Sequence, residues 1–261
     1  FFQRWAPAAP EVFQGALREI LNHRRLFVGM HVLLYGLFFG TMLMGMNAPL
    51  MNYWMTHYIG AMFRDGNLSY IGEAYASGNI AWAALATFQN NYIVQTLLLT
   101  FVISIPPVAL GVLKTALSFS LVGFAMAPLW VGTASGMTFH SITMALELEA
   151  YIVACFAVVA WARRLLGMLG DQLKYEVITG VMLLLAALIM TLMLGLHPYF
   201  SALLAGTAWS IRLLRVAVER DMPQVAASVR MLVGAAVLTG VMLVIAAIYE
   251  ATTLILLKPI M

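Results

Sequence analysis

Long apolar stretches separated by short polar connections make up most of the chain after residue 25. The hydrocarbon core of a bilayer is about 30 Å thick, so one helical crossing needs about 20 mostly apolar residues. Seven stretches fit this pattern or come close to it: 26–46, 92–113, 115–130, 139–161, 177–196, 198–216 and 231–257. The predicted fold class is therefore all-α, a polytopic transmembrane helix bundle of about seven spans.

Composition agrees with a membrane location. Of the 261 residues, 63% are hydrophobic and 10% are charged, and the mean hydropathy is +0.92. One soluble core could not bury so much apolar surface, whereas a bilayer can solvate it. The formal charge of +3 comes from basic residues that lie between apolar segments, which argues against a nucleic-acid-binding face. The single cysteine, Cys155, excludes an internal disulfide framework.

Basic residues are distributed unevenly among the connections. With the amino terminus in the cytoplasm and seven spans, twelve of the 14 lysines and arginines face the cytoplasm, as the positive-inside rule requires. A six-span arrangement that leaves 197–230 outside would place four arginines in the wrong compartment. We therefore expect a multi-pass protein of the inner (cytoplasmic) membrane with an extracytoplasmic carboxyl terminus and no cleavable signal.

Two segments outside the predicted spans have patterns of their own. Residues 1–25 precede a single transmembrane helical domain, 26–261, and combine apolar side chains at helical spacing with arginines, which is typical of an interfacial helix on an anionic leaflet. Packing of this helix against the bundle is the alternative. The extracytoplasmic loop 47–91 is rich in aromatic residues, so we expect short interfacial helices with a turn at 65–67. This loop would serve as a partner-docking surface or as a lid.

Three glutamates lie inside the most apolar stretches: Glu147, Glu149 and Glu250. An ionised carboxylate at membrane depth is costly unless it is paired, protonated or facing a polar cavity, so such residues indicate function. At 1.5 Å per residue, Glu147 and Glu250 lie about 12 Å and 10 Å below the outer ends of their spans. His140 shares a helical face with Glu147, so we expect an intramembrane polar cluster of His140, Glu147 and Glu250 that handles a proton, a cation or a ligand. Helix packing by protonated carboxyls is the alternative.

Glu149 points about 200° away from Glu147 around the helix, so this second buried acid would face another crevice or a partner subunit. Pro106 and Pro107 remove two backbone donors and predict a helix break inside the span 92–113. Lys114 would be an anchor at the membrane surface, and His31 stands alone on an apolar helix, so we expect no metal site. No nucleotide loop, nucleophile elbow or zinc-protease motif occurs, so we expect neither a cofactor nor an enzyme.

Two sequence motifs resemble the stage II sporulation protein M family. The first is Glu147-Leu148-Glu149-Ala150, followed by an apolar run and Arg163-Arg164; the second is Ala246-Ala247-Ile248-Tyr249-Glu250 in the last span. Asn90-Asn91 and the region 111–123 are also similar, and the likeness covers roughly 88–164 and 209–254. The chain departs from the family around His140, where a proline and a glycine are absent, and around 114–115, and the hairpin 177–216 is an insertion into a five-span plan.

The resemblance implies a non-catalytic membrane subunit or scaffold of a larger membrane complex. The alternative is the permease subunit of an ATP-driven exporter of the type-2 class, which the amino-terminal helix, the broken span and the embedded carboxylates favour. Expected partners are the lipid bilayer and other membrane protein subunits, together with an extracytoplasmic wall-remodelling protein in the first case or a cytoplasmic ATPase in the second.

Overall fold

The computed structural model describes residues 10–102, 104, 108–129, 131–195 and 198–257, and all regular structure in these ranges is helical. The first half contains α2 (Glu11–Asn22), α3 (Arg24–Asn47), α4 (Pro49–Arg64), α5 (Ser69–Ala76), α6 (Ile80–Phe88) and the π-helix η2 (Gln89–Val102). The second half contains α7 (Val108–Ala125), α8 (Val131–Leu169), the 3-10 helix η3 (Gly170–Gln172), α9 (Leu173–Leu194) and α10 (Pro198–Leu257). The predicted all-α class is confirmed for these residues.

Three described helical stretches are long and apolar enough to cross a membrane: Arg24–Asn47, Ser141–Leu194 and Leu203–Leu257. They support a membrane protein. The count of seven crossings and the orientation of the termini stay predictions.

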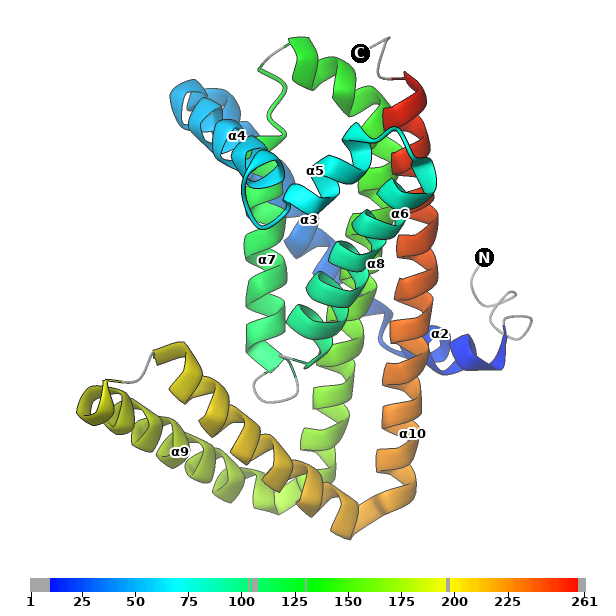
Figure 1. Ribbon diagram of the computed structural model, residues 1–261. Coiled ribbons are helices and arrows are strands. Elements are labelled where there is room, and N and C mark those ends of the chain that lie inside the picture. Colours follow the sequence, from blue (N-terminus) through cyan, green and yellow to red (C-terminus); the bar gives the residue numbers. More distant parts are fainter. Residues whose placement is uncertain (1–9, 103, 105–107, 130, 196–197, 258–261) are drawn as a thin grey trace.

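Most of the helices form one bundle. In Figure 1, α7, α8 and the later part of α10 run side by side with η2, and α3 packs behind them against α7 and α8. Alanines at 150, 154, 157 and 160 of α8 are almost completely buried, as are Ile152, Phe156 and Val158 between them, so α8 is the central helix. Small residues let neighbouring backbones approach closely, which compensates for the weak hydrophobic drive between helices in lipid.

Close backbone approach is clearest between α3 and α7. A methyl group placed at Gly45 would lie 2.6 Å from the carbonyl oxygen of Phe124, and one at Gly123 would overlap the carbonyl oxygen of Phe38. Only glycine fits at these two positions, because any Cβ would push the helices apart.

A hairpin projects from one end of the bundle. It consists of α9 and the first part of α10, and α9 packs chiefly against α10 (Figure 1). Asp221 interrupts α10 with non-helical angles of φ −153° and ψ 76°, and its carboxylate accepts a hydrogen bond of 3.0 Å from the backbone N–H of Gln224. Asp221 thus caps the helix that follows, with Pro223 in the first turn where its missing N–H costs nothing. The predicted connection around 217–230 is therefore a capped kink.

Two predicted boundaries differ from the structure. The span 92–113 is not one helix, because η2 ends at Val102 and α7 begins at Val108 and packs back against η2. The predicted break at Pro106 and Pro107 lies outside the described residues, in the interval between these helices. The predicted loop 47–91 is indeed divided into short helices, but α6 continues into η2 and packs on α10, so 80–91 belongs to the bundle.

The amino-terminal helix α2 lies across α10. Gly15 faces the backbone of Met231, and a methyl group at Gly234 would overlap the carbonyl oxygen of Val12. This is the packed arrangement that the sequence left open, and contact of α2 with an anionic leaflet stays a prediction.

Candidate functional site

The structure brings Glu147 of α8 and Glu250 of α10 together inside the bundle, where the two carboxyl groups interact electrostatically. Asn91, in the first turn of η2, donates a hydrogen bond of 2.6 Å from Nδ2 to Glu147 Oε1. Asn90 Nδ2 in turn donates to Asn91 Oδ1 at 2.9 Å, which fixes the amide of Asn91 with its donor toward the acid. The carboxyl of Glu147 is therefore held by an oriented donor.

Tyr75 of α5 closes the other side of this pair. Its hydroxyl lies 3.1 Å from Thr87 Oγ1 of α6, and Tyr75 is close enough to Glu250 for the two groups to interact electrostatically. The short helices α5 and α6 thus contact the bundle through polar side chains. We call Asn91, Tyr75, Glu147 and Glu250 the acid cluster.

Charge balance limits what the acid cluster can hold. Two carboxylates at short range in a medium of low dielectric constant repel each other strongly, so one shared proton or one bound cation relieves the repulsion. The groups that interact with the two acids among the described residues are Asn91, Tyr75 and Tyr151, which are neutral, and the acids themselves. Within the same part of the chain, no three His, Cys, Asp or Glu side chains gather as metal ligands.

Polar groups continue from the acid cluster along one face of α8. Tyr151, one turn after Glu147, interacts electrostatically with both acids. Lys114 of α7 lies with Nζ 5.7 Å from the centre of the Tyr151 ring, and the same ammonium donates a 3.0 Å hydrogen bond to the carbonyl oxygen of Gln95 in η2. Cys155 lies one turn further along α8, close to Thr115 and Lys114 of α7. We call Tyr151, Lys114 and Cys155 the polar row.

The prediction that Lys114 anchors at the membrane surface stays a prediction. Lys114 sits in the second turn of α7, partly buried against η2 and α8. The wide π-helical turn of η2 presents carbonyl groups at this level, and Thr96 and Thr100 hydrogen-bond the carbonyls five residues earlier, at 2.7 and 2.8 Å. Segments of π-helix are uncommon and often mark functional sites.

Glu149 forms a separate centre on the other side of α8. Its Oε2 lies 2.8 Å from Nε2 of His31, and its Oε1 accepts a 2.9 Å hydrogen bond from the hydroxyl of Tyr35. His31 Nδ1 lies 2.8 Å from the carbonyl oxygen of Phe27, which can only accept, so Nδ1 carries a proton. The bond between Nε2 and Oε2 then contains one further proton, and the pair is neutral overall whichever atom holds it.

The sequence-predicted residues thus separate into groups. Glu147 and Glu250 come together, Glu149 faces a different crevice with its side chain 36% exposed, and the side chain of His140 lies outside the described residues. Sequence reasoning left His31 without a partner and did not single out Tyr75. Asn91 was noted only for its resemblance to a family motif, which is the one signal that could have marked it.

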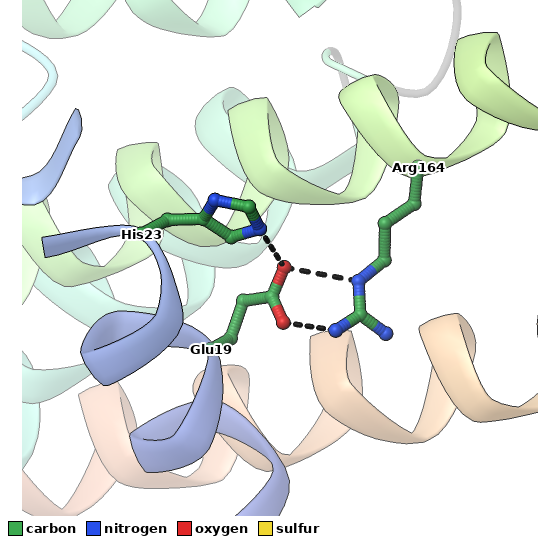
Figure 2. Close-up of polar contacts among 3 residues, drawn as sticks. All are labelled: Glu19, His23 and Arg164. Carbon is green, nitrogen blue, oxygen red and sulfur yellow. Dashed lines mark hydrogen bonds and ion pairs between the residues drawn. The ribbon is translucent and has the colours of Figure 1, made fainter. Parts of the chain in front are cut away.

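A further buried acid lies at the opposite end of α8. Glu19 of α2 is 1% exposed and forms a two-bond ion pair with Arg164, including a 2.9 Å hydrogen bond from Arg164 Nε to Glu19 Oε1 (Figure 2). His23 Nε2 lies 3.2 Å from the same Oε1. This ion pair fastens α2 to the central helix and is a structural element away from the acid cluster.

The geometry of the acid cluster is the basis for assigning a function, because the comparisons with known proteins supply none. No protein-family model, curated protein or solved structure matches this chain. The resemblance to the stage II sporulation protein M family remains a prediction from the motifs.

Proposed function

We propose that this chain is a non-catalytic integral membrane subunit, a scaffold of a larger membrane complex, in which the acid cluster binds one proton. The observation that carries the proposal is the meeting of Glu147 and Glu250 from two bundle helices, bridged to α5 and η2 by Tyr75 and Asn91. A single proton satisfies two carboxyl groups, whereas a metal cation needs a larger shell of oxygen ligands.

Protonation would couple the bundle to the helices that lie on it. When the proton is bound, α5 and α6 stay attached to α8 and α10 through the acid cluster; when it is lost, two carboxylates repel each other and strain these contacts. The aromatic surface of α4 is exposed beside them, with Trp54 and Tyr58 each 66% exposed. This surface is the docking face that we propose for an extracytoplasmic partner.

The second candidate is the permease subunit of an ATP-driven exporter. The observation that favours it is the polar row, which extends the acid cluster inward along α8 toward Lys114 and the π-helix η2. Such a row of ionisable groups suits a pathway for a proton or a polar solute. The connections beside η3 and the kink at Asp221 would then contact the ATPase.

One purification distinguishes the two candidates. The protein is isolated gently from its native membrane, and the proteins bound to wild type are compared with those bound to Glu147→Gln and to the control Glu73→Gln, which alters an exposed acid of α5. A wall-remodelling enzyme that is lost only from Glu147→Gln supports the scaffold. A stoichiometric ATPase in place of that enzyme supports the permease and overturns the scaffold.

A further inference from the structure

A groove with a volume of about 690 Å³ lies between α2 and α10, at the end of the bundle where Glu19 pairs with Arg164. Its walls combine apolar and basic side chains. Val12 of α2 and Val233 of α10 line it together with three arginines, Arg18, Arg164 and Arg230.

The lining of the groove has a net positive charge, because its three arginines face two acids, Glu11 and Glu19. Glu19 is engaged by Arg164. Within the described part of the chain, Arg18 hydrogen-bonds only the neutral amide of Gln14, at 2.8 Å. Arg230 is exposed and has no hydrogen-bond or ion-pair partner among the described residues. Two guanidinium groups, Arg18 and Arg230, are therefore available to an anion.

The position of the groove relative to the membrane indicates which kind of anion it can bind. Arg164 and Arg230 directly flank the apolar stretches 139–161 and 231–257, so the groove opens where lipid headgroups lie. From this opening a row of exposed valines leads along α10 at intervals of four residues: Val233, Val237 and Val241, with 54%, 37% and 44% of their surface exposed. A row at this spacing lies on one face of the helix and offers an apolar track to an acyl chain.

We propose that the groove between α2 and α10 binds an anionic phospholipid, with its phosphate at Arg18 and Arg230 and an acyl chain along Val233, Val237 and Val241. Both halves of the ligand have a matching surface: guanidinium groups recognise the phosphate, and the valine row replaces contact with neighbouring lipids. The bound lipid would connect α2 to α10 at the membrane surface. This proposal does not depend on the acid cluster or on the identity of any protein partner.

Native mass spectrometry of the full chain in neutral detergent tests the proposal by titration with phosphatidylglycerol, and with phosphatidylcholine for comparison. The variants are Arg18→Gln, Arg230→Gln and the double variant. The control is Arg215→Gln, which removes the same charge from an exposed pair with Glu219 outside the groove. A basic residue near the membrane surface contributes about fivefold in affinity for anionic lipid, so the double variant should bind phosphatidylglycerol roughly thirtyfold more weakly. Arg215→Gln should bind it like wild type.

Inorganic phosphate separates a lipid site from a simple anion site. Excess phosphate at constant ionic strength should not displace phosphatidylglycerol, because it lacks the chains that contact the valine row. Displacement by phosphate, or equal binding of the two lipids, overturns the proposal. Undiminished binding by the double variant also overturns it. Arg18 is exposed and its replacement leaves the core intact, so Arg18→Gln alone decides the question if the double variant does not fold.

Discussion

Removing Arg164 should destabilise the protein because it leaves the carboxylate of Glu19 without its main partner. Glu19 is 1% exposed, while the side chain of Arg164 is 32% exposed. Breaking a buried ion pair by deleting one partner costs about 3–5 kcal/mol. Water can reach the site through the space that Arg164 vacates, so we expect Arg164→Met to cost about 3 kcal/mol, the lower end of that range. This loss of unfolding free energy would reflect weaker attachment of α2 to α8.

The assay is reversible unfolding in mixed micelles, followed by circular dichroism. Arg163→Met is the matched control, since Arg163 is the exposed neighbour and its loss should change the unfolding free energy by less than about 0.5 kcal/mol. In a double-mutant cycle, the variant that combines Glu19→Gln with Arg164→Met should lose about 2 kcal/mol less unfolding free energy than the sum of the two single losses, because no charge is then left buried. Equal effects of Arg164→Met and Arg163→Met would refute the reasoning.

Three further predictions concern the rest of the bundle. Gly123→Val should lower the free energy of unfolding by about 2 kcal/mol in the same assay, because the new side chain overlaps the backbone of α3. Gly36→Val is the control, since Gly36 is exposed, and an equal loss in this variant would contradict the importance of close backbone approach. Glu149→Gln should cost less than about 1 kcal/mol, since an amide can still donate to neutral His31 and accept from Tyr35, whereas His31→Leu should cost about 2 kcal/mol by leaving the acid without that partner. A reporter fused after residue 261 should be active only outside the cytoplasm, and a cytoplasmic signal would reverse the predicted topology.

The order of apolar residues along the chain predicted the all-α class, and three of the described helical stretches are long and apolar enough to cross a membrane. The convergence of Glu147 and Glu250 also follows from sequence, since equal depth and the cost of leaving two acids in lipid favour their meeting. Glu147 and Glu149 are about 200° apart around their helix, which predicts correctly that the two acids contact different helices.

Contacts between segments far apart in the chain could not be predicted from the sequence. Glu149 pairs with His31 across 118 residues, and no periodicity reveals which face of α3 meets α8. The boundary between η2 and α7 was misplaced because a pair of prolines indicates an interrupted helix but does not reveal how the flanking helices pack. The contacts of Lys114 with Gln95 and Tyr151 depend on that packing and were not predicted. Tyr75 could not be identified because the position of α5 on the bundle depends on tertiary packing.

The shared proton of the acid cluster can be measured directly by infrared difference spectroscopy on the protein in lipid at neutral pH. A protonated carboxyl has a carbonyl stretch that a carboxylate lacks. We predict this band in wild type, a change in its frequency in both Glu147→Gln and Glu250→Gln because the proton then loses its second carboxyl acceptor, and an unchanged band in the control Glu73→Gln. A wild-type spectrum without the band, or a band that both substitutions leave unchanged, would contradict the proposal that Glu147 and Glu250 hold one proton between them.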